Sequence, residues 1–416
     1  MTQTLDDLRG EVTALFDREP QALEDEERYR VYRRLRHEAP VLAFDDMVVV
    51  SRYNDILSIV RDPETFSSQR GTGSLMKARA SSLTAIQADK LREILRFHAM
   101  SITEADNPEH ARLRGLANYA FTPRRVSSMR GQIQELTDRL LEPADRRGTI
   151  ELVSELCYPL PLQVILAMFG VPLEDAEDIR RWSDEMALAA GSVFADVDRA
   201  YDNLVAFREY VTRQIEERRR STGQDDLLTA LMAAEEDGTS LSTEELVVLF
   251  VRLLFAGHET TTNRIANSVV ALLRHPDQLQ LLKEDPSLMR SAIEELLRYR
   301  TSVQTLHRVA TRGTEIGGVP VRAGQSVRLL LGSAHHDEEV FTEPERLDLR
   351  RENASRHIAL GFGIHTCLGA WLQRLESEVA ISTLLTRHPG LRLVSVGPPR
   401  PNFIMSGPRS VHIDLC

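Results

Sequence analysis

The sequence reads Leu360-Gly361-Phe362-Gly363-Ile364-His365-Thr366-Cys367-Leu368-Gly369 just before an amphipathic stretch that predicts a helix from Ala370 to about Thr386. Three glycines within residues 361–369 permit tight turns and close approach of the backbone to a neighbouring group. Cys367 stands at the start of the predicted helix, where the helix dipole and the free N–H groups favour a thiolate. A thiolate in this place can be a nucleophile or a metal ligand.

The loop alone leaves the chemistry of Cys367 open. A zinc site is disfavoured, because no Cys-x-x-Cys or other paired spacing accompanies the cysteine. A nucleophile would want a histidine base, and His365 is two residues away, although closeness in sequence is weak evidence of contact. An inert buried cysteine is the usual alternative, and Cys157 fits that description.

A long apolar helix is predicted upstream of this loop. Ser242-Thr243-Glu244-Glu245 is a capping box, and the pattern that follows continues to about Arg274. Leu246 to Ala256 is apolar nearly all round apart from Arg252, which predicts a buried central helix.

The apolar run of this helix is interrupted by Ala256-Gly257-His258-Glu259-Thr260-Thr261-Thr262. One interpretation is a helix kink, with Thr260 bonded back to the Ala256 carbonyl. The other is a groove of small residues where a ligand approaches the backbone, and where an acid and an alcohol side by side move protons. The segment by itself does not decide between the two.

Composition narrows the class of protein. The 416 residues carry 51 Lys and Arg against 62 Asp and Glu, a net charge of −11, which argues against nucleic acid as a partner. Three cysteines are too few for a disulfide framework and fit a reducing compartment. The N-terminus lacks a signal pattern and no run reaches the ~18 apolar residues of a membrane span, so we expect a cytoplasmic protein without membrane attachment.

Strand signals are few and short. Residues 41–43 and 47–50 predict a hairpin, and residues 307–310, 319–321 and 326–331 predict a second small sheet that 411–413 could close. Most other segments, including residues 85–97, read as helix. The fold class is therefore mainly α with small β-sheets (α+β), and we expect one compact domain over residues 1–416.

Taken together, these segments resemble the cytochrome P450 family, the haem-thiolate monooxygenases, in its soluble bacterial form. The loop is similar to the family's cysteine signature, Phe-Gly-x-Gly-x-His-x-Cys-x-Gly, in all but the leading Phe. Residues 256–261 match the family's oxygen-activation motif, and Glu295-Leu296-Leu297-Arg298 matches its Glu-x-x-Arg motif. Pro108 to Arg114 is similar to the segment whose His and Arg bind haem propionates.

The resemblance implies a triangular fold around the 242–274 helix, with haem b (iron protoporphyrin IX) between that helix and the cysteine loop and helix of 360–386. Cys367 would be the thiolate ligand of the iron, while Thr260 and Glu259 would deliver protons to bound O2. Glu295 and Arg298 would be structural, pairing to lock the segment around 346–356. The remaining cofactor-binding residues implied are His110, Arg114, Ala256, Gly257, Arg308, His365 and Gly369.

Two departures from the family pattern are evident. Leu360 stands where the family usually has the Phe that shields the sulfur, which bears on the iron potential. Trp371 and Gln373 replace the usual small or Pro residues just after the loop. None of these changes removes a ligand.

The substrate pocket is expected to be lined by residues that are mostly apolar. Arg252 is the unusual member; it lies about 80° around the helix from Thr260 and borders the pocket face. It would either meet an anionic or carbonyl-rich substrate or pair with an acid on a neighbouring helix, and the second is favoured. The candidates are Leu83, Ile86, Val193, Phe194, Arg252, Leu253, Val303, Leu306, Phe403 and Ile404.

The activity implied is an external monooxygenase that hydroxylates or epoxidises a small organic substrate, such as a secondary metabolite. Because the chain has no flavin or iron–sulfur motif, electrons from NAD(P)H are expected through a ferredoxin reductase and a ferredoxin. Two alternatives keep the haem: an oxidative-coupling or peroxide-driven enzyme, and a non-catalytic haem protein that binds a ligand. The intact Glu259–Thr260 pair favours activation of O2. A monomer is expected.

Overall fold

The computed structural model describes residues 2–17, 25–69, 83–190, 196–221, 223–236, 239–399 and 404–415. Contacts within the chain divide it into two compact units. The first unit comprises Met1–Ser67, Met129–Pro161 and Glu259–Cys416, and the second comprises Ser68–Ser128 and Leu162–His258. The fold is mainly helical with small sheets, which confirms the predicted class.

A five-stranded sheet forms part of the first unit. Its strand order is β1-β2-β10-β7-β3. The strands are β1 (Val41–Ala43), β2 (Met47–Val50), β10 (Ser326–Leu330), β7 (Thr305–Ala310) and β3 (Phe66–Ser67). The predicted hairpin is confirmed, because β1 and β2 pair antiparallel with Val41 opposite Val50.

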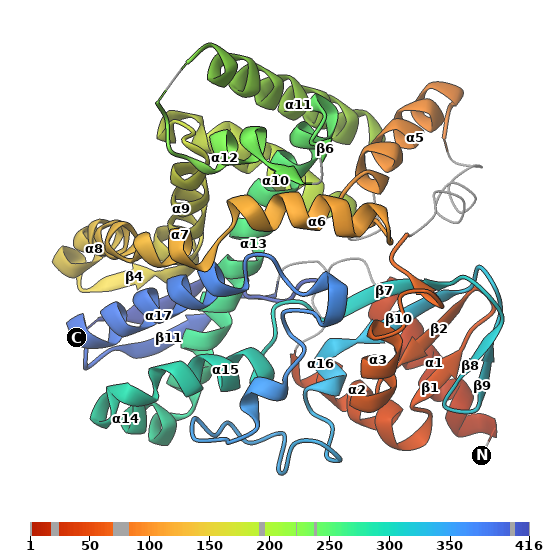
Figure 1. The fold of residues 1–416 in the computed structure, drawn as a ribbon. Coiled ribbons are helices and arrows are strands. Elements are labelled where there is room, and N and C mark those ends of the chain that lie inside the picture. The colour runs from red at the N-terminus through yellow and green to blue at the C-terminus, as the bar shows by residue number, and fades with distance from the viewer. Residues whose placement is uncertain are drawn as a thin grey trace. The chain divides into compact units, whose positions relative to one another are not determined.

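The alternation of side chains along these strands gives the sheet two buried faces. Val49 packs with Leu8 and Tyr32 in one core cluster, whereas its neighbours Val48 and Val50 pack in the other. Successive residues of a strand point to opposite faces, so β2 contributes to both cores. Figure 1 shows α2 (Asp25–Glu38) and α3 (Tyr53–Val60) beside this sheet.

The prediction of a separate second sheet is wrong. β7 and β10 join the hairpin strands, with β10 parallel to β2, while β9 (Val319–Val321) pairs only with β8 (Thr314–Ile316). The C-terminal β12 (Val411–Asp414) lies in a third sheet, ordered β11-β12-β4. Strand propensity is local in sequence, but pairing partners are set by how distant segments pack, which explains the error.

The other elements of the first unit are helices and two strands of the third sheet. These elements are α1 (Thr2–Asp17), α8 (Arg130–Arg147), α14 (Pro276–Glu284), α15 (Met289–Tyr299), α16 (Leu331–Ala334), α17 (Ala370–Arg387), β4 (Thr149–Glu151) and β11 (Arg392–Val396). Among them, α17 confirms the helix predicted from Ala370.

The second unit consists mainly of helices. α5 (Ala85–Ala99) confirms the predicted helix, and Thr84 caps it with a capping box to Gln87. α10 (Ala176–Ala190) packs on α11 (Val197–Arg220) through Trp182 and Phe207, whose ring centroids are 5.1 Å apart. The remaining elements are α6 (Glu109–Ala120), α7 (Pro123–Ser128), α12 (Leu227–Ala233), β5 (Glu235–Glu236) and β6 (Thr239–Ser240).

Two helices have residues in both units: α9 (Pro159–Phe169) and the 32-residue α13 (Thr243–Arg274). The predicted capping box of α13 is confirmed. The Glu245 N–H donates to Ser242 Oγ at 3.2 Å, and the Ser242 N–H donates to the Glu245 carboxylate at 2.7 Å. Within the described parts of the chain, no helix is both long enough and apolar enough to cross a bilayer.

Candidate active site

The cysteine loop folds back on its own backbone. The Cys367 N–H donates to the Leu360 carbonyl at 2.7 Å, and the Thr366 N–H donates to the Gly363 carbonyl at 3.2 Å. These bonds hold the cysteine just before the first residue of α17, Ala370. The Cys367 side chain is exposed, whereas that of Cys157 is buried. The loop therefore presents its thiol outward.

Glycine is present at three positions of this loop, and the structural role differs from one position to the next. Gly361 has φ +74°, and a Cβ there would lie 2.7 Å from the His365 carbonyl oxygen, so only glycine fits without strain. Gly363 is also left-handed, with φ +66°. At Gly369 the backbone is ordinary, and a Cβ would stand 4.0 Å from Cys367 Sγ. Its absence leaves the space beside the sulfur open.

These observations fit the group that the resemblance implies. An exposed thiol at the beginning of a helix favours the thiolate form. Three apolar side chains of the loop, Phe362, Ile364 and Leu368, are only half-buried. A thiolate beside partly uncovered apolar side chains suits a haem, because the thiolate would bind the iron and the apolar side chains would pack against the ring.

Over residues 251–261, one face of α13 is partly exposed to solvent, whereas the rest of the helix surface is buried. Ala256 is exposed, and Arg252, Leu253, Gly257 and Thr260 are half-buried. Residues that recur every three or four positions lie on one helix face. The residues between them, Leu254, Phe255, His258 and Glu259, and the flanking Val251 and Thr261 are all buried. We call the five residues the open stripe of α13; it favours the groove interpretation of the polar segment.

Glu259 lies beside the open stripe and is held from within the first unit. Its side chain is 4% exposed, and Asn263 Nδ2 donates to Glu259 Oε1 at 3.3 Å. Asn263 is in turn packed against Gly407, where a Cβ would lie 2.2 Å from Asn263 Oδ1. The segment around Gly407 therefore holds the Asn263 amide in place, and this amide orients the acid.

Packing between two helices explains why position 257 is a glycine, and this could not be seen in the sequence. A Cβ at Gly257 would lie 3.1 Å from Cγ1 of Ile165, which is tighter than ordinary van der Waals contact. Ile165 belongs to α9. The small residue therefore allows α9 to approach α13, whatever approaches the open stripe.

The residues expected to bind propionates lie in both units. In the second unit, His110 and Arg114 are four residues apart on α6 and so share one face. Burial and the nearby Arg114 lower the pKa of His110, against the opposing effect of Asp106, so this histidine is neutral at pH 7. In the first unit, Arg308 is buried on β7 and donates to the His307 carbonyl at 2.7 Å.

His365 belongs to the same unit as Arg308 and Cys367. It is half-buried and ends the short 3₁₀ turn Gly363–His365 of the cysteine loop. The turn fixes its place two residues before the thiol.

Glu295 and Arg298 form an ion pair with 0% exposure of both side chains, at 2.7 Å. The Arg298 guanidinium also donates to the carbonyls of His335, Pro344 and Arg346. A second cation, Arg351, donates to both carboxylate oxygens of Glu295 at 3.1 Å. The pair thus ties α15 to the segment that precedes the cysteine loop.

The expected pocket residues fall on several elements. Leu83 and Leu253 are half-buried in the second unit, where Ile86 is 70% exposed. In the first unit, Val303, Leu306 and Ile404 are half-buried. Val193, Phe194 and Phe403 lie outside the described residues.

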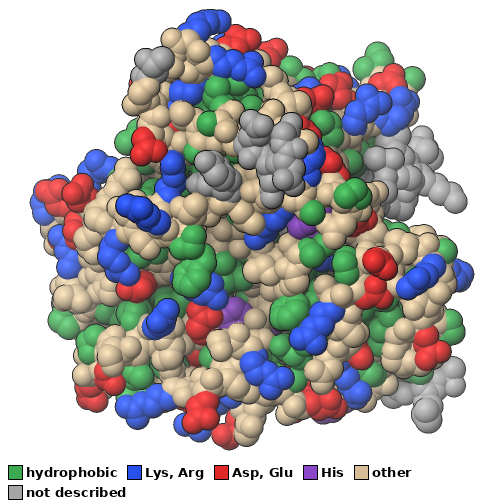
Figure 2. Space-filling view, in the orientation of Figure 1, with side chains coloured by type: hydrophobic (Ala, Val, Ile, Leu, Met, Phe, Trp, Pro, Cys, Tyr) green, Lys and Arg blue, Asp and Glu red, His purple; other side chains and the backbone are tan. Residues whose placement is uncertain are grey.

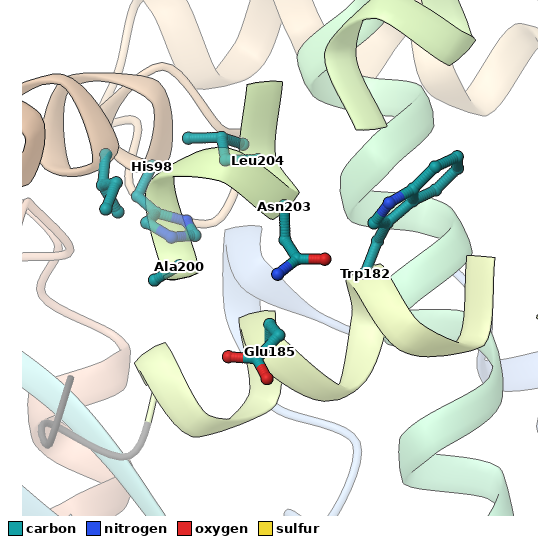
Figure 3. Close-up of a pocket in the computed structure, with 7 residues that line it drawn as sticks. His98, Trp182, Glu185, Ala200, Asn203 and Leu204 are labelled. Atoms are coloured by element: carbon teal, nitrogen blue, oxygen red, sulfur yellow. The ribbon is translucent and has the colours of Figure 1, made fainter. Parts of the chain in front are cut away.

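Arg252 makes polar contacts with two residues of the second unit. Its Nη2 donates to Thr103 Oγ1 at 3.0 Å, and its Nη1 lies 3.3 Å from His98 Nδ1. His98 also borders a cavity of about 10 Å³, roughly the room that one water molecule needs. Figure 3 shows His98 and Asn203 facing this space, which is lined by Ile94, His98, Trp182, Glu185, Ala200, Asn203 and Leu204.

A larger cavity of about 230 Å³ also lies in the second unit. Its lining is rich in carboxylates, which disfavours an anionic ligand at this place. The lining residues are Gln69, Ala99, Met100, Glu104, Ala105, Asp106, Glu109, Leu113 and Glu245.

Sequence reasoning missed the groups that support the named residues. Asn263 follows Glu259 by one helical turn, a spacing that could have suggested the contact. Arg351 carries no local signal of its contact with Glu295. Glu294 is a third case, since it accepts from Arg374 Nε at 2.6 Å and from His357 Nε2 at 3.0 Å.

Comparison with known proteins bears on the family to which the chain belongs. The family model described as Cytochrome P450 matches residues 75–390. "Cytochrome P450 CYP107DY1" of Priestia megaterium is 36% identical over 374 residues, 87% of this chain and 89% of the relative. "Nocardicin C N-oxygenase" of Nocardia uniformis subsp. tsuyamanensis is 39% identical over 87% of this chain and 88% of its own.

A solved structure extends the agreement to the fold. P450BioI, crystallised with an acyl carrier protein ligated to hexadec-9Z-enoic acid, has a TM-score of 0.85 and 32% identity over 94% of this chain and 98% of its own. A match to three quarters of the chain by the family model, with relatives above 30% identity along most of their length, is decisive for family membership. The chain belongs to the cytochrome P450 family, whose members are haem-dependent oxidoreductases.

Proposed function

We propose that this chain is a haem-thiolate monooxygenase that hydroxylates or epoxidises a small organic substrate. The observation that carries the proposal is the open stripe of α13, which includes the hydroxyl of Thr260 beside the buried acid Glu259. An acid and an alcohol next to a partly open helix face are the groups needed to deliver protons to a ligand there. The exposed thiol of Cys367 supports the same assignment.

The residues that would hold the cofactor follow from their chemistry. Haem b, when bound through Cys367, supplies the activation of O2. Ala256, Gly257 and Gly369 have little or no side chain and would leave room for the ring. The propionates would be bound by His110, Arg114, Arg308 and His365. The arginines would supply charge and bidentate hydrogen bonds, whereas His110, with its lowered pKa, would donate a hydrogen bond as a neutral ring.

Thr260 and Glu259 would divide the handling of protons. Neighbouring residues of a helix point about 100° apart, so the hydroxyl can face the open stripe while the carboxylate lies beside it. The Thr260 hydroxyl would hold a proton at Oγ1 and position a water. Glu259, oriented by Asn263, would pass protons to that water from outside.

The electrons would come from NAD(P)H through a ferredoxin reductase and a ferredoxin. The sequence has no flavin or iron–sulfur motif of its own. On the cysteine side, Trp371 is 56% exposed four residues after Cys367, which supports a small apolar docking contact there. Figure 2 shows positive and negative side chains intermixed over the visible face.

The substrate class is proposed to be a secondary metabolite. The name of one relative, the nocardicin C N-oxygenase, supports this. P450BioI is described with a ligated acyl carrier protein, so delivery on a carrier protein is a further form of the substrate to test.

The test is turnover of the purified haem-loaded protein with NADH, ferredoxin and reductase. A panel of metabolites, offered as free acids and as carrier-protein thioesters, is first screened for a low-spin to high-spin shift. We expect a product that carries one 18O atom from 18O2. Product formation with hydrogen peroxide alone, and none with O2 and reductant, would support the peroxide-driven alternative. Spin shifts without any product would support a ligand-binding protein.

A further inference from the structure

Arg264 is a buried cation that the proposed mechanism does not use. It is 0% exposed on α13, one helical turn after Thr260. Its Nη2 donates to the Ile293 carbonyl of α15 at 2.7 Å. Within the described part of the chain, no hydrogen bond of good geometry reaches its Nε or Nη1. Buried polar groups are normally satisfied, so a guanidinium in this state calls for an explanation.

The carboxylate that acts on Arg264 is already neutralised by another cation. This carboxylate belongs to Glu294, which accepts from Arg374 Nε at 2.6 Å and from Arg374 Nη2 at 3.0 Å. Burial lowers the pKa of His357, which donates to the same carboxylate, so this ring is neutral at pH 7. Burial also lowers the pKa of Arg264, to about 9, and the guanidinium stays charged at pH 7. We call these four residues the α15 cluster; two cations and one carboxylate leave it a net charge of +1.

Hydrogen bonds join the α15 cluster to the cysteine loop from both sides. His357 Nδ1 accepts from the Ala359 N–H at 3.2 Å, just before the loop begins. After the loop, Arg374 Nη1 donates to the Ala370 carbonyl at 3.3 Å, and the Ala370 N–H donates to the Cys367 carbonyl at 3.3 Å. All of these residues belong to the first unit. The uncompensated charge of the cluster is therefore next to the segment that would bind the iron.

Stability gives no reason for a charge at position 264. A buried charge costs free energy of folding, and an apolar side chain of similar volume in its place is often neutral or stabilising. The electric field of the charge, however, extends beyond its contacts. A unit charge acts over roughly 10–15 Å in a protein interior, where the effective dielectric constant is about 20 instead of 80.

We propose that Arg264 raises the reduction potential of the haem iron through the field of its buried charge. One electron from reduced ferredoxin converts ferric to ferrous haem and adds one negative charge to the site, while the ferredoxin is oxidised by one electron. A fixed positive charge in the interior stabilises the more negative state, so it favours entry of this electron. The proposal rests on the haem binding and the electron supply proposed above.

The first experiment is a redox titration of the substrate-free, haem-loaded protein, followed by its visible spectrum. Arg264→Met removes the charge and keeps the volume. It should favour the ferric form about threefold or more at a given potential, which for one electron is a shift of about 28 mV to more negative values. Arg264→Gln, which is neutral but can still donate to the Ile293 carbonyl, should shift as much, and it replaces the methionine variant if that variant does not fold. A wild-type potential in the neutral variants, or a shift in the methionine variant alone, would overturn the proposal.

Arg146→Met is the matched control for the loss of one positive charge. Arg146 lies on α8 in the same unit and is 68% exposed, so its charge is in water and the potential should equal that of wild type. The difference between wild type and Arg264→Met should persist at high salt, because ions screen exposed charges far more than buried ones. A difference that vanishes in salt would contradict a buried charge as its source.

Two further measurements separate the charge from a structural role. The reduced carbon monoxide complex of both neutral variants should keep its red-shifted Soret band, and Arg264→Met should melt at or above the wild-type temperature. A lost band would mean that Arg264 holds the cysteine loop in place, and a much lower melting temperature would mean that the cation is compensated; either would overturn the account. A potential that shifts as expected in a protein without O2-dependent product would instead refute the monooxygenase function and leave the role of Arg264 standing.

Discussion

Replacing Glu295 with alanine removes an acceptor that three groups share. The carboxylate accepts from Arg298 at 2.7 and 2.8 Å, from Arg351 at 3.1 Å and from the Asp348 N–H at 3.0 Å. Glu295 and Arg298 are both 0% exposed, so water cannot take the place of the lost partner. The variant leaves one fully buried cation uncompensated.

The magnitude follows from this burial. Removing one partner of a buried ion pair typically costs about 3–5 kcal/mol. Arg351, 8% exposed, loses its partner as well, and Arg298 is kept in place by three backbone carbonyls. We therefore expect the upper part of that range, about 4–5 kcal/mol. At roughly 2 °C per kcal/mol for a large protein, the melting temperature falls by roughly 8–10 °C.

The assay is thermal unfolding followed by far-ultraviolet circular dichroism, with haem content measured in parallel. Glu142→Ala is the control, because the Glu142–Arg146 pair of α8 is exposed, at 61% and 68%. Exposed pairs contribute about 0–1 kcal/mol, so the control should melt within about 2 °C of wild type. If Glu295→Ala melts like the control and retains its haem, the buried pair does not stabilise the fold.

Three further predictions concern other parts of the first unit. Cys367→Ala should lose the red-shifted Soret band of the reduced carbon monoxide complex; retention of the band would disprove the ligand assignment. Burial would raise the pKa of Glu294, but hydrogen bonds from His357 and Arg374 lower it to about 2. Its contribution to stability is therefore complete above about pH 5 and lost as the pH falls toward 2, about 3 kcal/mol in all. Glu294→Gln should flatten this part of a stability–pH curve, and an unchanged curve would count against the pair. Trp371→Ala should slow reduction by ferredoxin several-fold without moving the melting temperature; an unchanged rate would argue for docking elsewhere.

The helices near the site could be predicted because their signals are local. The capping box at Ser242 and the apolar periodicity that follows predicted the bounds of α13. The helical patterns over residues 85–97 and from Ala370 to about Thr386 likewise predicted α5 and α17. The pairing of β2 with β10 could not be predicted, since it depends on packing between distant segments. The single-domain organisation over residues 1–416 stays a prediction.

In the candidate site, too, residues in contiguous motifs could be predicted and contacts between distant segments could not. The roles proposed for Cys367, Thr260 and Glu259 rest on motifs that are contiguous in sequence. A Glu-x-x-Arg pair by itself resembles an ordinary surface pair, and only the 0% exposure of Glu295 distinguishes it. The burial of Glu376, which is 1% exposed on α17, had no signal in the sequence, because a glutamate in an amphipathic helix is normally solvated and its burial depends on what packs against the helix.

The most direct test of the monooxygenase account compares Thr260→Ala with Thr260→Ser in coupled turnover with ferredoxin, reductase and a substrate that shifts the haem spin state. Both variants should bind substrate and consume NADH and O2. The alanine variant, which lacks the hydroxyl that positions protons, should release hydrogen peroxide in place of most product, whereas the serine variant should retain most of the product. Glu259→Gln, which loses the supply of protons, should instead slow O2 consumption. Wild-type product per NADH in Thr260→Ala would contradict the account, because the chemistry would then not depend on the hydroxyl of the open stripe.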